Sequence, residues 1–364
     1  MNEAALRAAV GRCLAEQLTF AAFRPPGGYV QLWVQHRSAV QHAKGLPAGP
    51  RAFVLAPFFL DPLRVPFLQG DIALTFDAAE IDLSALDGCS GSDARPAPTS
   101  SPTTPAAYAA WITAAKAAFA AGSLRKVVLS RTLDLPVPPG AITELFVGAL
   151  AREPNAFVAL VFTPEHGLWS GASPEQLVHA ENGRVRVDAL AGTLPTAHAP
   201  ADAAAWGEKE RDEQQLVTDR VLALFAHLGL KNVTTRGPAM RRAGPVAHLH
   251  TIIEADLGAC SLSDLVPALH PTPAIGGTPT DAARDFIRMH ETHDRQLYAG
   301  FWGPVHGPDT ADLFVNIRCL RAEGDHMRLF LGAGITAGSD PDREWAETLE
   351  KGKVWSVPIA ALHA

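Results

Sequence analysis

Short apolar runs rich in β-branched and aromatic residues recur along the chain, and each predicts a β-strand. The first two, GYVQLWVQ (28–35) and RAFVLAPFF (51–59), follow an amphipathic segment at residues 1–18 that predicts a helix. Later runs of the same character occupy residues 125–135, 157–163, 184–190, 246–257, 312–322 and 326–335.

Several of these strands are joined by short turns. LVHAENGRVRV (177–187) and NIRCLRAEGDHMRLFL (316–331) each pair two strands around a tight turn, which favours antiparallel sheet over repeated βαβ units. The predicted fold class is therefore α+β, with large, mainly antiparallel β-sheets flanked by helices.

Helical segments lie between the strands. An alanine-rich helix at 106–122 ends at Gly122, a suitable C-terminal cap, and the last helix starts at the N-cap Asp340 with Pro341 in the first turn. The helices are predicted at residues 106–122, between Asp202 and Leu228, between Thr280 and His290, and from Asp340 to Trp355.

The domain prediction rests on one change of composition. Residues 94–105, ARPAPTSSPTTP, are rich in Pro, Ser and Thr, cannot bury a core and predict a surface loop. This loop separates an N-terminal variable part (1–93), which we expect to pack on the core, from a catalytic core (106–364). A chain of 364 residues allows two domains or one compact unit, and we expect one compact unit overall.

The composition of the chain excludes some classes of function. A formal net charge of −7 argues against a nucleic-acid surface, and no apolar run reaches the ~20 residues that a membrane span needs. The N-terminus lacks the features of a secretory signal, so a cytoplasmic, membrane-free protein is expected, and a monomer. The four cysteines are widely spaced and form no CxxC motif.

Two glutamate pairs at helical spacing, Glu210/Glu213 and Glu344/Glu347, are the most informative feature. Residues three apart share a helix face, so like charges there cost about 0.2–0.5 kcal/mol per pair. A hard divalent cation such as Mg²⁺ would offset that cost and leave positions for an anionic substrate. The alternative is two solvated helix faces, with Glu347 pairing with Lys351.

Two histidine patterns give weaker signals. A lone strand histidine such as His248 is more often a satisfied core residue than a functional one. HETH at 290–293 is one residue too short for the HExxH zinc motif, and we therefore discount zinc.

Ten ordered motifs between Ala106 and Pro358 resemble the chorismate-utilising enzymes, the family of isochorismate, salicylate, anthranilate and aminodeoxychorismate synthases. The motifs are KVVLSR (126–131), SGASPEQLV (170–178), ALAGT (189–193), EKERDE (208–213), HLHT (248–251), LHPTPAIGG (269–277), YAG (298–300), NIRC (316–319), GAGI (332–335) and SDPDREWAETLEK (339–351). The resemblance implies that family's fold and chorismate as the substrate.

The resemblance assigns two proton-transfer residues. Lys126 matches the lysine of the water-adding members, whereas ammonia-using members usually have glutamine there. A lysine can take a proton from water only in its neutral form, and burial can lower a lysine pKa. Glu175 matches the general acid that protonates the departing hydroxyl, and Ser173 and Pro174 predict that it lies in the first turn of a helix.

The resemblance also implies ligands. Glu213 and Glu347 match the principal Mg²⁺ ligands, with Glu210 and Glu344 beside them, and the metal would neutralise the ring carboxylate. His248 matches a histidine near the leaving hydroxyl. Residues matching the contacts to the enolpyruvyl carboxylate or the pocket wall are Arg318, Lys351, Gly332, Gly334, Thr193, Ala191, Ala274 and Ile275.

Two motifs point to one reaction within the family. LHPTPAIGG and ALAGT resemble the isochorismate synthase forms, which implies addition of water to chorismate at C2 with loss of the C4 hydroxyl, for menaquinone or siderophore biosynthesis. Salicylate synthase is the alternative, and a non-catalytic chorismate-binding protein is a third hypothesis. One departure stands out, because Gln296 occupies a position where the family commonly has glycine.

Overall fold

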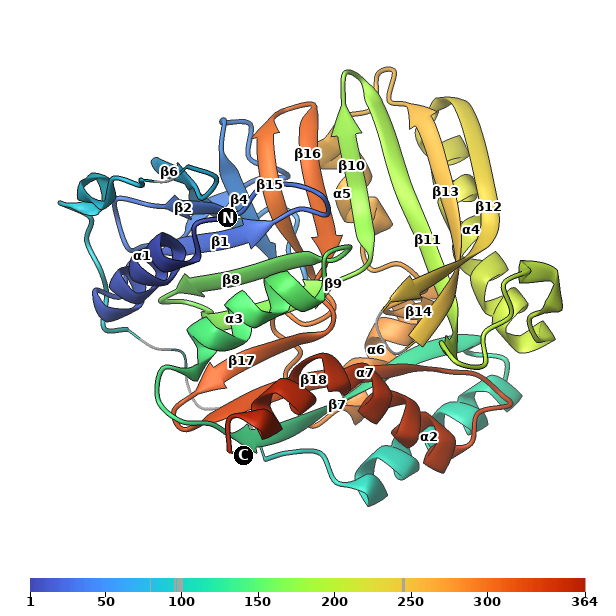
Figure 1. The fold of residues 1–364 in the computed structure, drawn as a ribbon. Helices are drawn as coiled ribbons and strands as arrows, with labels where there is room; N and C mark the ends of the chain where they lie inside the picture. The colour runs from blue at the N-terminus through green and yellow to red at the C-terminus, as the bar shows by residue number, and fades with distance from the viewer. Residues whose placement is uncertain (79, 95, 97–100, 244–245, 364) are drawn as a thin grey trace.

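The computed structural model describes the chain except for residues 79, 95, 97–100, 244–245 and 364. Its described residues form two nine-stranded sheets in which every neighbouring pair is antiparallel (Figure 1). The predicted α+β class with mainly antiparallel sheets is thus confirmed.

Strands that are neighbours in a sheet often come from distant parts of the chain. In spatial order, the first sheet holds β14 (Gly277–Thr278), β7 (Lys126–Pro136), β18 (His326–Ile335), β17 (Cys319–Glu323), β9 (Gly167–Ser173), β8 (Phe157–Thr163), β1 (Phe20–Arg24), β2 (Gln31–Val34) and β6 (Ile72–Thr75). The second holds β12 (Lys231–Ala243), β13 (Val246–Asp256), β11 (Arg184–Pro195), β10 (Gln176–Glu181), β16 (Thr310–Val315), β15 (Phe301–Gly307), β4 (Ala52–Ala56), β5 (Val65–Gln69) and β3 (Gln41–Ala43).

Helices cover both sheets. They are α1 (Glu3–Ala15), α2 (Pro105–Ala120), α3 (Ala141–Arg152), α4 (Glu208–Leu228), α5 (Leu262–Leu269), α6 (Thr280–His290) and α7 (Pro341–Ala361), with two 3₁₀ turns, η1 (Leu83–Leu86) and η2 (Ala203–Ala205). In Figure 1, α1, α3 and α7 lie over one face of the first sheet, and α7 packs along β18.

Strand β8 shows why the sheets hold together. Its residues alternate between two apolar cores, so both faces of the strand are buried and its sequence, FVALVFT, is almost continuously apolar. Phe157, Ala159 and Val161 belong to the core that joins both sheets, and Val158, Leu160 and Phe162 to the core beneath α1, α3 and α7. Across the sheets, the Phe157 and Phe314 rings stack with centroids 4.2 Å apart.

The chain passes from one sheet to the other at two places that local patterns do not predict. The predicted strand 312–322 is two strands, because β16 ends at Val315 in one sheet and β17 begins at Cys319 in the other. The predicted helix start at Ser173–Pro174 is wrong, since these residues join β9 to β10. The Ser173 side chain instead accepts a hydrogen bond from the Glu175 N–H at 3.2 Å.

Most predicted helices are confirmed, with shifted ends. In α7, Asp340 is the N-cap and its carboxylate accepts from the Arg343 N–H at 3.1 Å, but the helix continues past Trp355 to Ala361. Gly122 follows α2 with a left-handed φ of 73°, as a C-terminal glycine should. The segment from Asp202 to Leu228 contains the short turn η2 before α4 begins at Glu208.

The N-terminal part contributes strands to both sheets. β1, β2 and β6 extend the first sheet beyond β8, and β4, β5 and β3 extend the second beyond β15. Part of the predicted loop 94–105 (residues 95 and 97–100) lies outside the described residues. At its end, residues 101, 102 and 104 are exposed, whereas Thr103 is buried and accepts from the Thr132 N–H at 3.1 Å. The division into 1–93 and 106–364 stays a prediction.

Within the described parts of the chain, none of the helices combines the length and apolarity that crossing a membrane requires.

Candidate active site

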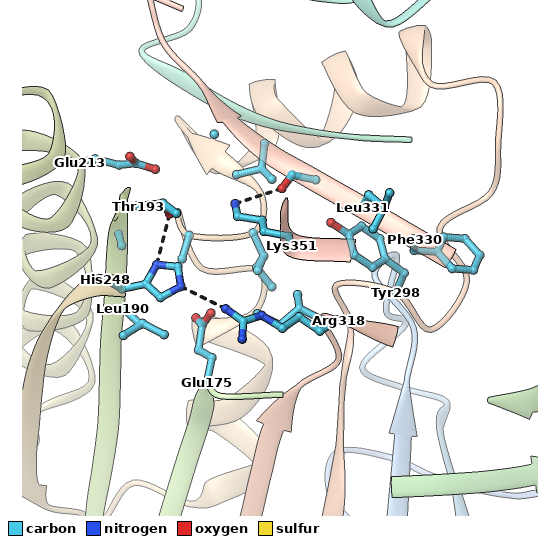
Figure 2. Close-up of a pocket in the computed structure, with 17 residues that line it drawn as sticks. Glu175, Leu190, Thr193, Glu213, His248, Tyr298, Arg318, Phe330, Leu331 and Lys351 are labelled. Carbon is cyan, nitrogen blue, oxygen red and sulfur yellow. Dashed lines mark hydrogen bonds between the residues drawn. The ribbon is translucent and has the colours of Figure 1, made fainter. Parts of the chain in front are cut away.

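A cavity of about 730 Å³, its open mouth included, lies where the two sheets meet (Figure 2). The residues that line it are Val128, Glu175, Leu190, Ala191, Thr193, Glu213, His248, Ala274, Ile275, Tyr298, Ile317, Arg318, Phe330, Leu331, Gly332, Gly334 and Lys351.

Glu175 enters the cavity from the crossing between β9 and β10. It is 4% exposed, and its backbone is held by the Ser173 hydroxyl and by a bond from the Val315 N–H to its carbonyl at 3.0 Å. Burial, reinforced by the charge of Asp188, raises its pKa to about 8. The carboxyl group is therefore protonated at neutral pH and able to donate a proton.

Arg318 enters from the crossing between β16 and β17. Its backbone has a left-handed φ of 50°, and its carbonyl accepts from Trp355 Nε1 at 2.7 Å and from the Ala172 N–H at 3.1 Å. Burial lowers its pKa to about 10, so the guanidinium stays charged at neutral pH. Figure 2 shows this guanidinium beside the Glu175 carboxyl group and the His248 ring.

His248 is neutral and has a fixed ring orientation. Arg318 donates to its Nε2 at 3.3 Å, so the proton sits on Nδ1, which lies 3.2 Å from the Gly192 carbonyl and 3.2 Å from Thr193 Oγ1. Burial, followed by the charges of Arg318 and Lys351, holds its pKa well below 6.5.

A β-bulge presents Thr193 and the Gly192 carbonyl to His248. The pairing of β11 with β13 shifts register between Ala191 and Thr193, and Gly192 there has a φ of 69°. A Cβ on Gly192 would lie 2.7 Å from the Glu210 carbonyl oxygen, so the start of α4 packs directly on the bulge. Bulges of this kind often re-aim side chains at functional sites.

Lys126, the first residue of β7, is fully buried, and its Nζ lies 2.8 Å from Glu213 Oε1 of α4. Burial opposes the charge on Glu213, but Lys126 outweighs it and the pKa of Glu213 lies below its usual value. A Cβ on Gly334 would lie 2.6 Å from Glu213 Oε1 and 3.3 Å from Lys126 Cε. A side chain at 334 would therefore displace the Glu213 carboxylate from its place beside Lys126.

Lys351 crosses the cavity from α7. Its Nζ lies 2.8 Å from Glu347 Oε1 and donates to the Gly332 carbonyl at 3.1 Å, the bond drawn in Figure 2. A Cβ on Gly332 would collide with the Tyr298 hydroxyl. Both glycines of the GAG motif thus make room for neighbouring side chains.

The four predicted metal ligands differ in position. Glu213 lines the cavity, Glu347 contacts the cavity residue Lys351, and the buried Glu344 lies 3.4 Å from Lys209 Nζ. The Glu210 carboxylate lies against Gly207 at the start of α4. Among the described residues, no three His, Cys, Asp or Glu side chains converge closely enough to bind a metal ion.

The acidic side chains nevertheless suit a hard cation. Burial opposes the charge on Lys209, but Glu344, Glu213 and Glu347 together raise its pKa. Burial and the charge of Glu347 raise the pKa of Glu344. Carboxylate oxygens from two helices thus surround one ammonium group, and oxygen donors of this kind fit Mg²⁺.

The cavity gathers most of the substrate-site residues that the sequence suggested, Ala191 included. Lys126, Glu347, Glu344 and Glu210 are not among the residues that line it. The cavity residues not identified as site residues from the sequence are Val128, Leu190, Tyr298, Ile317, Phe330 and Leu331. The sequence could have identified Tyr298, because it is the first residue of the YAG motif. The apolar residues of this group have the same pattern as ordinary core residues.

Gln296 keeps the backbone that glycine would adopt. Its φ is 49°, in the left-handed region that glycine favours, and its side-chain oxygen accepts from Arg321 Nη1 at 2.8 Å. Its carbonyl accepts from the Phe58 N–H at 3.0 Å. The turn therefore survives the departure from the family pattern.

The comparisons with known proteins identify the family of this chain. A family model described as chorismate binding enzyme matches residues 83–354, and the chain belongs to this family. It is 34% identical over 250 residues to isochorismate synthase DhbC of Bacillus subtilis, a match that covers 65% of this chain and 63% of DhbC. The first curated relatives are thus matched over less than two thirds of their length.

Solved structures share the fold. The menaquinone-specific isochorismate synthase MenF of Escherichia coli aligns with a TM-score of 0.75 at 23% identity, covering 96% of this chain and 88% of MenF. Anthranilate synthase component I of Streptococcus pneumoniae aligns with a TM-score of 0.68 at 19% identity, covering 94% and 91%. Because two different reactions share this fold, the fold alone does not select between them.

Proposed function

We propose that the protein is an isochorismate synthase, an isomerase that converts chorismate to isochorismate by adding water at C2 with loss of the C4 hydroxyl. One observation carries the proposal: the buried, protonated Glu175 lines the cavity on one side, and the buried Lys126 contacts Glu213, which lines it on another. Lys126 lies beside Glu213, and Figure 2 shows Glu213 and Glu175 well apart across that cavity. The relatives named isochorismate synthase support the same reaction.

The proposed chemistry needs one base and one acid. Lys126 takes the proton from the water that attacks C2, a step for which its amine must be in the neutral form, and Glu175 gives its proton to the hydroxyl that leaves C4. A pKa of about 8 keeps Glu175 protonated at neutral pH, as this role requires. The neutral His248 ring, which accepts from Arg318, lies near the leaving hydroxyl.

The substrate's two carboxylates bind elsewhere. Arg318 and Lys351 hold the enolpyruvyl carboxylate, since a guanidinium fork suits a carboxylate. Glu213 and Glu347, with Glu344 and Glu210 nearby, would hold Mg²⁺, which when bound neutralises the ring carboxylate. Thr193, Ala274 and Ile275 shape the wall around the ring.

The product would supply menaquinone or siderophore biosynthesis. We further propose that the enzyme acts as a cytoplasmic monomer, without nucleic acid. The charge of −7 agrees with the absence of a nucleic-acid partner.

Incubating the pure protein with chorismate and Mg²⁺ and separating the products tests the function. Isochorismate should accumulate in equilibrium with chorismate, with little salicylate or pyruvate. Stoichiometric pyruvate would instead identify a salicylate synthase, and tight chorismate binding without turnover would identify a non-catalytic binding protein.

A further inference from the structure

A buried ion pair behind the cavity wall has no part in the proposed chemistry. Arg295 Nε and Nη2 donate to the two Glu291 carboxylate oxygens at 2.8 and 2.6 Å, and both side chains are at most 2% exposed. The pair belongs to the segment after α6 that includes the HETH sequence. Buried charges are costly, so a pair kept there needs a structural reason.

The ion pair completes an open edge of the first sheet. Among the described residues, β7 pairs on its outer side only with the two-residue β14, opposite Lys126 and Val127. Beyond that point, Arg295 Nη2 donates to the Val128 carbonyl at 2.6 Å, and the Ser130 N–H donates to Glu291 Oε1 at 2.7 Å. Because buried backbone groups need partners, the charged pair takes the place of a neighbouring strand.

The same guanidinium holds the loop that precedes β14. Arg295 Nη1 donates to the Ile275 carbonyl at 3.1 Å, and the Val128 N–H donates to the Gly276 carbonyl at 2.8 Å. Val128 and Ile275 both line the cavity. One side chain thus bonds to the wall loop and to the strand that begins with Lys126.

We propose that Arg295, held by Glu291, is a positioning residue that sets the placement of Lys126 relative to the cavity wall at Ile275. Its effect on catalysis rests on the proposed function, whereas its effect on the wall does not. The guanidinium lies 4.2 Å from the centroid of the Phe58 ring, which restricts its movement. Arg318 and Lys351, the proposed carboxylate contacts, lie outside this network, so the rate should depend on Arg295 more than substrate affinity does.

Two variants test the proposal. Glu291→Leu/Arg295→Met removes both charges together and leaves no unpaired buried charge. Arg295→Lys keeps the charge but lacks the fork that reaches both carbonyls, and it serves if the double variant does not fold. A matched control is Asp134→Leu/Arg328→Met. It removes the ion pair between Asp134 of β7 and Arg328 of β18, whose two hydrogen bonds measure 2.6 and 2.7 Å. Asp134 lies eight residues along the strand from Lys126.

Hydrogen exchange without substrate gives a readout that needs no reaction. We expect exchange to quicken at residues 126–130 and 272–278 in the Arg295 variants and to stay as in the wild type in the control. With chorismate, kcat should fall about 10- to 100-fold, as expected for a displacement of about 1 Å, while Kd changes less than about threefold.

If both segments exchange in the Arg295 variants as they do in the wild type, Arg295 does not hold them and the proposal is wrong. An equal loss of kcat in the control would show that the effect is not specific to Arg295, which also overturns the proposal. If the wild type does not convert chorismate, the proposed function fails, and the exchange result alone decides the positioning role.

Discussion

At the residue scale, the two proposed proton-transfer side chains have different surroundings. Lys126 is fully buried against the Glu213 carboxylate, whereas burial and the charge of Asp188 keep the Glu175 carboxyl group protonated. Each residue therefore gives a separate prediction.

Replacing Lys126 should remove the base. Lys126→Gln keeps a hydrogen-bond donor for Glu213 but cannot accept a proton, so kcat should fall about 100- to 10,000-fold, or about 3–5 kcal/mol of barrier. Substrate Kd should change much less, because Arg318 and Lys351 are untouched. Steady-state kinetics and titration calorimetry measure the two quantities, and near-native kcat with water as nucleophile would refute the role of the lysine.

The alkaline limb of the pH–rate profile should belong to Glu175. Its raised pKa means that activity is present below about pH 8 and is lost as the pH rises through that value. Asp188, whose carboxylate lies 2.9 Å from Arg241 Nη1, raises the Glu175 pKa, while Lys126, Arg241 and Lys351 lower it.

Asp188→Asn therefore should move the alkaline limb to lower pH, since ionising Glu175 no longer faces a neighbouring negative charge. Asp256→Asn, at the far end of the β11–β13 pair, serves as the control and should leave the limb in place. An unmoved limb in Asp188→Asn would contradict the assignment of that limb to Glu175.

Family motifs predicted the positions of Glu175, Arg318 and His248, but not how the backbone presents them. Glu175 lies between two strands, and Arg318 lies where a single predicted strand divides between two sheets. Local apolar patterns carry no information about which sheet a segment joins, because that choice depends on distant partners. The glutamate spacing did not predict that the Glu210 carboxylate lies against Gly207 at the start of α4.

At the element scale, α4 and α7 bring carboxylates and lysines together. Glu213, Glu347 and Glu344 each lie beside a lysine, at 2.8, 2.8 and 3.4 Å. A cation that binds these carboxylates must compete with the ammonium groups. Lys209 is the most exposed of the three lysines, with 44% of its side chain accessible.

Mg²⁺ should therefore bind more tightly to Lys209→Met than to the wild type, by about two- to fivefold, the worth of a partly exposed ion pair. Titration calorimetry without substrate measures the Mg²⁺ affinity. The control is Lys353→Met, because Lys353 pairs with Glu350 at 2.7 Å on α7.

Removal of the metal gives a separate test: EDTA should abolish turnover, and added Mg²⁺ should restore it. Unchanged Mg²⁺ binding in Glu213→Gln and Glu347→Gln would rule out this site.

Elements with strong patterns were predictable. β8 and β18 follow apolar runs, and α7 follows its cap residues. Strand β12 was not predicted, because it is a largely exposed edge strand with the polar sequence KNVTTRGPAMRRA. Its pairing with β13 holds it in place, and a local sequence pattern does not predict which segments pair.

At the scale of the whole molecule, the site exists because two sheets meet. Lys126 comes from the first sheet, His248 and Thr193 from the second, and Lys351 from α7. Glu175 lies at the crossing from β9 to β10, and Arg318 at the crossing from β16 to β17. No single segment could hold this arrangement, so the geometry of the site depends on the complete fold.

The same architecture serves anthranilate synthase component I as well as isochorismate synthases. The central claim is therefore that this cavity uses water as the nucleophile. Conversion of chorismate in ¹⁸O-labelled water, followed by mass spectrometry at early times, tests it most directly. The account predicts one ¹⁸O atom in each isochorismate molecule, at the new C2 hydroxyl, and no matching release of pyruvate. Isochorismate without the ¹⁸O label would contradict the account. So would the formation of one pyruvate for each chorismate consumed with no labelled isochorismate.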